Sequence, residues 1–319
     1  MLSVFCAPSR YVQGRDATLH LPRELTRLGF GGRCLLVASP TAFKLLNDLW
    51  QESFEQSGIP LDVVLFQGEC TRAEIERLVV EARDRGAETL VGAGGGKVLD
   101  TTRAVAALLG KPVACCPTTA ASDAPCSALS VVYTLEGTFE ECLFYPRNPD
   151  LVLVDTKVIA KAPVRQLIAG MGDALATRFE AEASRHAFRA NVVGGLSTQA
   201  AAAIADLCYR TLLADGEAAV EAARVGAVTP ALERIVEANT LLSGLGFESG
   251  GLALAHSIHN GLTAAKETHG CLHGEKVAFG TLVQLVLEGR ERSLIDEVLD
   301  FCLRVGLPVT LEQLGLNPL

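Results

Sequence analysis

The sequence predicts an α/β domain with a mainly parallel sheet, followed by an all-helical domain. In the first half, short β-rich runs alternate with segments of helical period, the pattern of right-handed βαβ units. Near the middle of that half, a glycine-rich turn joins a strand to a helix. After Pro163, alanine-rich segments with helical period take over. We therefore expect an α/β domain over residues 1–162 and a helical domain over 163–319.

Runs of β-branched and apolar residues locate the strands of the first domain. They cover 33–38, 62–66, 88–92, 112–116 and 151–155. Thr71 and Glu74 have the T-x-x-E spacing of a capping box, and apolar residues then recur at helical spacing. The segments 128–134 and 141–145 flank an acidic turn that contains a glycine, 135–141, which predicts a β-hairpin.

Helical period marks the second domain at 173–184, 197–214, 230–244, 250–265 and 274–288. Pro230 follows Thr229, which suits a helix that starts with proline at its first position. Residues 293–304 predict one more helix with a single apolar face. The leucine-rich tail after it has little chain left to cover it, so we expect burial in a homo-oligomer larger than a dimer.

Composition excludes several classes of protein. The 319 residues are 49% hydrophobic with a net charge of −9, which argues against a nucleic-acid partner and against disorder. No apolar run reaches the length of a membrane span, and the N-terminus lacks the pattern of a signal peptide. The ten cysteines form no C-x-x-C pair. We therefore expect reduced thiols in a cytoplasmic protein that binds neither membrane nor nucleic acid.

The glycine-rich turn "LVGAGGGKVLDTTRAVA" favours phosphate binding. Glycines let backbone amides approach a phosphate, and the helix N-terminus favours its negative charge. The order of residues matches neither G-x-G-x-x-G nor the Walker loop, since Val91 and Val98 stand at required positions of the latter. A plain tight turn is the alternative, and the turn alone does not say which phosphate is bound.

Four of the six histidines, His256, His259, His269 and His273, crowd into "GLALAHSIHNGLTAAKETHGCLHGEK". Such crowding indicates a metal site, a proton relay, or chance. No carboxylate stands at a ligand spacing beside them. The residues by themselves do not decide between these three interpretations.

Several motifs together resemble the glycerol dehydrogenase branch of the metal-dependent, iron-containing-type alcohol dehydrogenases. They include "GGGKVLDTTRAVA", "SDAPCSALSVVYT", "GMGDALATRFEA", "GGLALAHSIHNGLTA" and "HGEKVAFGTLVQLVLE", in the family's order over essentially the whole chain. The resemblance implies a dehydroquinate synthase-like architecture with an N-terminal NAD-binding domain and a helical domain that holds a catalytic metal. It implies NAD-dependent oxidation of glycerol to dihydroxyacetone, and of related vicinal diols.

The resemblance also implies the residues of the site. One zinc per chain would be held by Asp173, His256 and His273, which leave positions open for substrate, as in catalytic zinc sites. The same residues, with Asp123, would contact the substrate. Cofactor contacts fall on Ser39, Gly94, Gly95, Gly96, Lys97, Asp100, Thr118, Thr119, Ser127, Leu129 and Tyr133. For Ser127, Leu129 and Tyr133, ordinary packing on one face of a strand is the alternative.

The two remaining histidines of the cluster carry alternatives. For His259, support of a ligand is favoured over a role as fourth ligand, because glycerol dehydrogenases use two histidines. For His269, a place in the site and a solvated surface position remain equally open.

The chain departs from the family's pattern in two places. Ser39 stands where relatives carry an aspartate that binds the adenosine ribose, so we expect weaker discrimination against NADP. The family continues past the end of this chain, so we expect a helical domain that lacks its last helices. The alternatives to a glycerol dehydrogenase are a dehydrogenase of other or phosphorylated polyols, a lyase of the dehydroquinate synthase type, and a truncated, weakly active homologue with an assembly or binding role.

Overall fold

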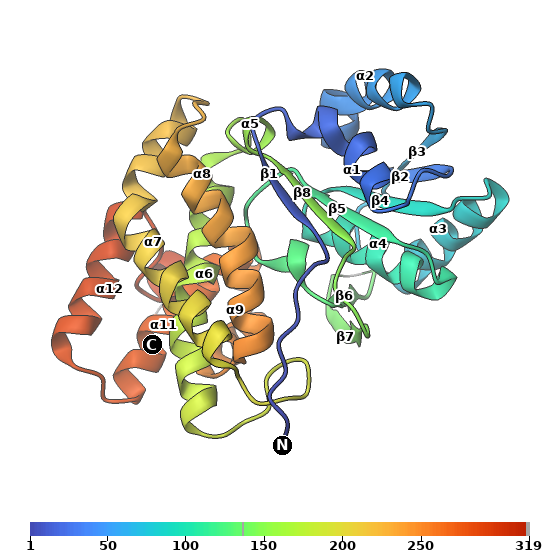
Figure 1. The fold of residues 1–319 in the computed structure, drawn as a ribbon. Helices are drawn as coiled ribbons and strands as arrows, with labels where there is room; N and C mark the ends of the chain where they lie inside the picture. The colour runs from blue at the N-terminus through green and yellow to red at the C-terminus, as the bar shows by residue number, and fades with distance from the viewer. Residues whose placement is uncertain (136, 317–319) are drawn as a thin grey trace. The chain divides into compact units, whose positions relative to one another are not determined.

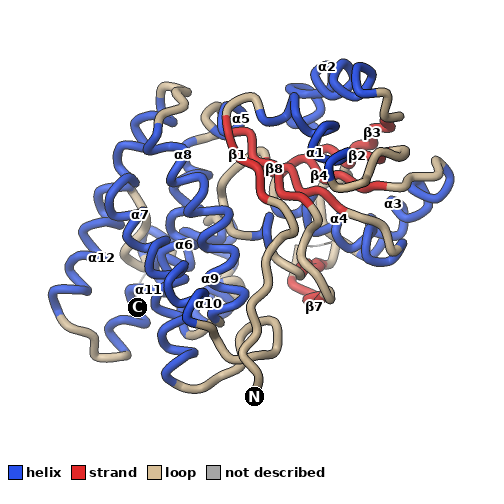
Figure 2. Tube along the Cα trace, in the orientation of Figure 1, coloured by secondary structure: helices blue, strands red, loops and turns tan. Residues whose placement is uncertain are grey.

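The computed structural model describes residues 1–135 and 137–316. It divides into two compact units. The α/β unit comprises Ala7–Thr119 and Ala124–Ile159, and the helical unit comprises Met1–Cys6, Ala120–Asp123 and the chain from Ala160 onward. Among the described residues, the strands coloured red in Figure 2 all belong to the α/β unit.

The α/β unit is built on a six-stranded parallel sheet in the described chain, with the order β1-β8-β5-β4-β2-β3 (Figure 1). The strands are β1 Tyr11–Gly14, β2 Cys34–Ala38, β3 Leu61–Leu65, β4 Thr89–Gly94, β5 Val113–Pro117 and β8 Leu151–Asp155. The five strands expected from the sequence are confirmed within one or two residues. The edge strand β1 was missed, because its polar sequence YVQG shows no run of apolar residues.

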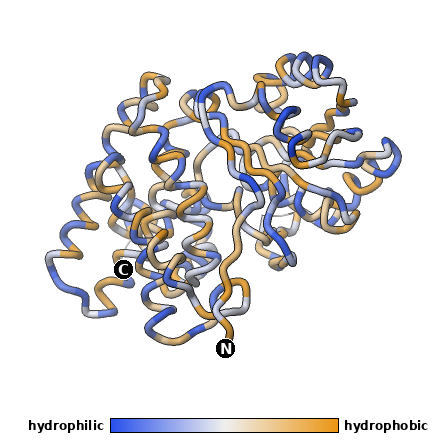
Figure 3. Tube along the Cα trace, in the orientation of Figure 1, coloured by the Kyte–Doolittle hydropathy of each residue, from blue (hydrophilic) through white to orange (hydrophobic). Residues whose placement is uncertain are grey.

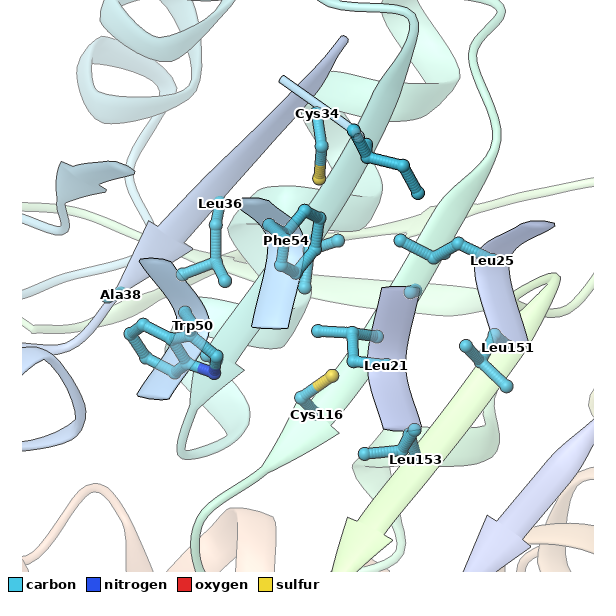
Figure 4. Packing of buried hydrophobic residues seen from close by; sticks show 14 of the residues in the cluster. Leu21, Leu25, Cys34, Leu36, Ala38, Trp50, Phe54, Cys116, Leu151 and Leu153 are labelled. Atoms are coloured by element: carbon cyan, nitrogen blue, oxygen red, sulfur yellow. The ribbon is translucent and has the colours of Figure 1, made fainter. Parts of the chain in front are cut away.

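Helices cover both faces of this sheet. On one face, α1 Leu21–Arg27 and α2 Pro40–Ser57 contribute Leu21, Leu25, Trp50 and Phe54 to a buried cluster against β2, β5 and β8 (Figure 4). On the other face pack α3 Arg72–Asp84 and α4 Gly96–Leu109. The central strands are buried along their length and predominantly apolar (Figure 3), as expected for a parallel sheet covered on both sides.

The expected capping box at α3 forms only by half. Thr71 accepts a hydrogen bond from the Glu74 amide at 3.1 Å, as an N-cap residue does. The Glu74 carboxylate, however, accepts from the Gln67 amide and pairs with Arg77 instead of returning to Thr71. The helix starts where the sequence predicts, but its glutamate stabilises the preceding loop.

The expected hairpin is present as β6 Leu129–Tyr133 and β7 Phe139–Phe144, which pair antiparallel. Ser127 precedes β6, so it does not share a strand with Leu129 and Tyr133 as predicted. Glu136, in the expected turn, lies outside the described residues. A short helix, α5 Thr156–Ile159, follows β8.

The helical unit contains α6 Val164–His186, α7 Gln199–Arg224, α8 Pro230–Glu237, α9 Ser243–Gly250, α10 Leu254–Leu262, α11 His273–Leu287 and α12 Arg292–Val305. The π-helical segment Ala238–Leu242 joins α8 to α9. Thr229 caps α8 ahead of Pro230, as predicted. Helix α6 packs against α7, α9 and α11 and so runs through the centre of the unit.

Besides residues 160–162 at the boundary, two segments expected in the α/β domain, Met1–Cys6 and Ala120–Asp123, belong to the helical unit instead. The Cys6 amide donates to Ser249 Oγ of α9 at 3.0 Å. The carbonyl oxygen of Ala120 accepts from Asn239 Nδ2 at 2.9 Å. The sequence pattern does not reveal that these two segments pack with the helical unit, because each is short and is followed by strands and helices of the α/β unit.

The C-terminal tail is largely covered by its own chain. Leu307 and Leu314 are buried, and Leu311 is 37% exposed. Leu307 packs against Gly172 of α6. The chain itself therefore buries Leu307 and Leu314, which the sequence had led us to expect in contact with a partner subunit. None of the described helices is both long and apolar enough to cross a bilayer.

Candidate metal centre and nucleotide-binding edge

Three side chains converge on one point of the helical unit. Asp173 Oδ1 lies 3.0 Å from His273 Nε2 and 3.5 Å from His256 Nε2. One ligand atom from each residue lies within 4.8 Å of the others. Asp173 is buried, His256 is half-buried and His273 is exposed, so the group opens to solvent on the side of His273.

Glycines allow the helices that carry these residues to approach closely. A Cβ atom on Gly274 would stand 1.7 Å from the Ala169 carbonyl oxygen of α6. A Cβ atom on Gly172 would stand 2.4 Å from the Gly274 carbonyl oxygen. Because Gly172 precedes Asp173 and Gly274 follows His273, this backbone contact between α6 and α11 sets the separation of the two side chains.

Glu180 orients the third residue, His256. Its carboxylate is fully buried on α6, and Oε2 lies 2.6 Å from His256 Nδ1. Oε1 accepts from the amides of Ala253 and His256 at 2.9 Å each. Burial lowers the pKa of His256, but Glu180 and Asp173 outweigh it and hold that pKa well above its usual value. With Nδ1 bonded to Glu180, Nε2 faces Asp173.

Glu180 was not identified from the sequence. Its signal is its spacing from Asp173, two turns along the same helix, which puts both carboxylates on one face. That signal is weak, because acidic residues at this spacing occur on many helices.

His259 supports His273 from one side. Its Nε2 lies 3.0 Å from His273 Nδ1, and its own Nδ1 lies 3.1 Å from Asn260 Oδ1. Burial, together with the two neighbouring imidazoles, lowers the pKa of His259 to about 3. His259 therefore contacts the candidate ligand His273, and its supporting role stays a prediction. His269 is exposed, which favours a solvated surface position over a place in the site.

Asp123 lies beside Asp173 in the segment Ala120–Asp123. Its amide donates to Asp173 Oδ2 at 3.3 Å, leaving Oδ1 to face the histidines. Burial and the negative charge of Asp173 raise the pKa of Asp123 well above its usual value. Burial also acts to raise the pKa of Asp173, but the two histidines outweigh it and hold that pKa below its usual value. Negative charge is thus kept on Asp173.

The donor set fits a divalent metal of the zinc type. At metal–ligand bonds of about 2.0–2.1 Å, the ligand atoms of a tetrahedral site are about 3.3–3.4 Å apart. The distances of 3.0 and 3.5 Å from Asp173 Oδ1 to the two imidazoles bracket that value. A buried carboxylate offers the charge that compensates a cation.

The predicted cofactor residues gather at the carboxyl end of the parallel sheet. Ser39 follows β2, and its amide donates to the Ala93 carbonyl at 2.9 Å. The Thr118 amide, after β5, donates to the Gly94 carbonyl at 3.0 Å. The strand order reverses between β2 and β4, and ligands of doubly wound folds bind at such a point.

Two glycines of the turn, Gly94 and Gly95, have different surroundings. A Cβ atom on Gly94 would lie 2.7 Å from Val98, so this glycine permits packing of α4 on β4. Gly95, the N-cap residue of α4, has open space on that side, which leaves the helix N-terminus approachable. Lys97 pairs with Glu69.

Other predicted cofactor residues differ in their surroundings. Asp100 is buried, with one oxygen paired to Arg103 and the other accepting from the Val131 amide. Both oxygens are therefore engaged in contacts that hold α4 against β6, and the contact of Asp100 with the cofactor stays a prediction. Ser127 is buried and donates to the Ala124 carbonyl. Leu129, Tyr133 and Thr119 are half-buried.

Comparison with known proteins establishes the family. Residues 8–156 match the family model of iron-containing alcohol dehydrogenase. The chain is 51% identical over 311 residues to glycerol dehydrogenase of Pseudomonas putida, across 98% of this chain and 85% of the relative. This chain belongs to the iron-containing alcohol dehydrogenase family. The resemblance and the fold class expected from the sequence are thereby confirmed.

Two further relatives extend the comparison of this family member. Glycolaldehyde reductase of Halobacterium salinarum is 48% identical, across 100% of this chain and 87% of the relative. The crystal structure of glycerol dehydrogenase from Schizosaccharomyces pombe aligns with a TM-score of 0.94 and 40% identity, across 98% of this chain and 79% of that one.

Proposed function

We propose that this protein is an NAD-dependent glycerol dehydrogenase that oxidises glycerol, and related vicinal diols, to the corresponding hydroxyketone. The observation that carries the proposal is the convergence of Asp173, His256 and His273, in a chain about half identical to a glycerol dehydrogenase. The reaction removes a proton from a hydroxyl group and a hydride from its carbon, so glycerol and NAD⁺ give dihydroxyacetone, NADH and H⁺.

In this proposal, Asp173, His256 and His273 hold one zinc ion per chain. When bound, the metal supplies Lewis acidity that lowers the pKa of a substrate hydroxyl, and the nicotinamide accepts the hydride. Glu180 keeps the His256 ring oriented. Asp123 hydrogen-bonds a second hydroxyl of the substrate.

NAD would bind at the carboxyl end of the parallel sheet. The pyrophosphate would take the amides of the Gly94–Lys97 turn at the N-terminus of α4. The ribose hydroxyls would face Ser39, and Thr118 and Thr119 would flank the cofactor. NAD is preferred over NADP, but because Ser39 is uncharged the discrimination against NADP is weaker than with an aspartate at this position.

A second candidate is the reduction of glycolaldehyde with NADH. The 48% identity to a glycolaldehyde reductase favours it, and the chemistry is the reverse of the oxidation of a two-carbon diol. Both candidates use the same site, so they differ in substrate size and in the direction that is faster.

Initial rates decide between these candidates. NAD reduction is measured with glycerol, 1,2-propanediol and glycerol phosphate, and NADH oxidation with dihydroxyacetone and glycolaldehyde, each with and without added zinc. We expect zinc-dependent activity with glycerol to exceed that with glycerol phosphate. Activity with glycerol phosphate alone would contradict the proposal, and a kcat/KM highest for glycolaldehyde would favour the second candidate.

Two broader expectations belong to the same proposal. The ten cysteines all carry free thiols, which supports a reducing, cytoplasmic setting. The homo-oligomer larger than a dimer stays a prediction from the sequence, since the burial of Leu307 and Leu314 within the chain removes the apolar surface on which it was based. Light scattering across a dilution series tests it, and a stable monomer at micromolar concentration would contradict it.

A further inference from the structure

Behind the candidate metal centre, two buried hydroxyl groups form a chain that ends on Asp123. Thr177 Oγ1 lies 2.9 Å from Ser243 Oγ, and Ser243 Oγ donates to Asp123 Oδ2 at 2.9 Å. Ser243 is fully buried and Thr177 is 2% exposed. Because Ser243 uses its single proton on the carboxylate, Thr177 must donate to Ser243.

The two hydroxyl groups connect Asp123 back to α6, the helix that also carries Asp173. Thr177 stands one helical turn after Asp173, and Asp173 Oδ2 accepts from the Asp123 amide at 3.3 Å. Asp123 is therefore held at two points: its backbone by Asp173, and its side chain by Ser243. Ser243 thus occupies Oδ2, and among the described residues no other side chain is recorded as a donor to Oδ1, the oxygen available to a ligand.

The π-helical segment Ala238–Leu242 directly precedes Ser243, and π-turns within helices are frequent at functional sites. Asn239 in this segment donates to the Ala120 carbonyl at 2.9 Å and to the Leu167 carbonyl at 3.1 Å. Its buried Oδ1 has no partner among the described residues, an unfavourable arrangement that packing must offset. Asn239 therefore hydrogen-bonds the first residue of the segment Ala120–Asp123, and Ser243 hydrogen-bonds the last.

A glycine supports the same arrangement. A Cβ atom on Gly170 would stand 1.9 Å from the Ala120 carbonyl oxygen and 2.4 Å from Asn239 Nδ2. The segment is therefore seated against α6 so closely that no larger residue fits at position 170.

We propose that Thr177 and Ser243 are positioning residues that fix the rotamer of Asp123, so that its free oxygen hydrogen-bonds the hydroxyl next to the reacting one. They thereby set the preference for vicinal diols over simple secondary alcohols. This inference rests on the proposed function, because it takes Asp123 to contact the substrate.

The test compares 1,2-propanediol with 2-propanol, which lacks only the adjacent hydroxyl. The selectivity, the ratio of their kcat/KM values, should fall about ten-fold in Ser243→Ala, as expected for one lost hydrogen bond of roughly 1.4 kcal/mol. The selectivity should fall less in Thr177→Val, and Thr177→Ser should retain the wild-type selectivity. Zinc affinity, measured by equilibrium dialysis, should stay within about two-fold in all three variants.

Thr281→Val is the matched control, because it removes a buried hydroxyl whose recorded bond within the described chain runs back along α11, to the Val277 carbonyl. Its selectivity should equal that of the wild type. In an Asp123→Ala background, Ser243→Ala should have almost no further effect on selectivity, since the side chain that Ser243 positions is already absent. This double-mutant cycle separates positioning from a general loss of packing.

The outcomes are distinguishable. A wild-type enzyme without diol preference overturns both this inference and the proposed function. A wild-type preference that survives unchanged in Ser243→Ala and Thr177→Val overturns the inference alone. Equal falls of kcat/KM for both alcohols, or a loss of zinc binding, would also overturn it, because they indicate disruption of the whole site.

Discussion

Replacement of Glu180 by glutamine tests how the protein orients its candidate metal ligands. Glutamine keeps the shape of the side chain but has one oxygen and one NH₂ group. If the oxygen continues to accept from the amides of Ala253 and His256, the NH₂ group faces His256 Nδ1 across 2.6 Å. The imidazole must then accept at Nδ1 and carry its proton on Nε2, the nitrogen that faces Asp173.

The magnitude follows from the contact that is lost. A hydrogen bond to a charged group contributes about 1.5–3 kcal/mol, and each 1.4 kcal/mol is ten-fold in an equilibrium constant. Zinc affinity should therefore fall about 10- to 100-fold, which is also the usual effect of removing a carboxylate behind a ligating histidine. Turning the amide round would restore the bond to Nδ1 but leave two buried amides facing NH₂, at a similar cost.

Zinc affinity is measured by competition with a chromophoric chelator at neutral pH. Glu182→Gln is the control, because Glu182 lies two residues along α6 but pairs with Arg290, away from the site. We expect the control to bind zinc like the wild type. If Glu180→Gln binds zinc within two-fold of that control, the carboxylate does not orient His256.

Three further substitutions test other parts of the arrangement. His273→Ala leaves two of the three candidate ligands, so zinc occupancy and turnover should nearly vanish; full occupancy by elemental analysis would contradict the assignment. Gly274→Ala forces α11 away from the Ala169 carbonyl and should cost about 1–3 kcal/mol of stability, with weaker zinc binding. Thermal unfolding should show no such loss for Gly261→Ala, where a Cβ atom meets nothing within 4 Å. Ser39→Asp keeps the N-cap of α2 and adds a charge that repels a 2′-phosphate, so the NAD/NADP ratio of kcat/KM should rise, whereas Ser39→Asn should leave it near the wild-type value. An unchanged ratio in the aspartate variant would show that position 39 does not face the ribose.

Local patterns in the sequence were enough to predict most of the α/β unit. Buried parallel strands are continuous apolar runs, and the helices between them carry their period and their caps in adjacent residues. The edge strand β1 escaped because its residues YVQG are half-buried and mixed in character. The capping box at α3 was wrong by half because Glu74 had a competing partner seven residues upstream, the Gln67 amide.

The candidate ligands Asp173, His256 and His273 could be named from motifs, but not from spacing, since His256 lies 83 positions after Asp173. Only the tertiary structure brings them together. Glycine contacts between α6 and α11 place Asp173 beside His273, and Glu180 holds His256, and no local pattern expresses either contact. The supporting residues Glu180, Thr177 and Ser243 are likewise set by packing. A hydrogen bond of a side chain depends on which helices meet and at what distance, whereas period, propensity and capping depend on neighbours in the chain. The sequence by itself therefore determined the elements and the residue types of the site, and the fold decided which of them touch.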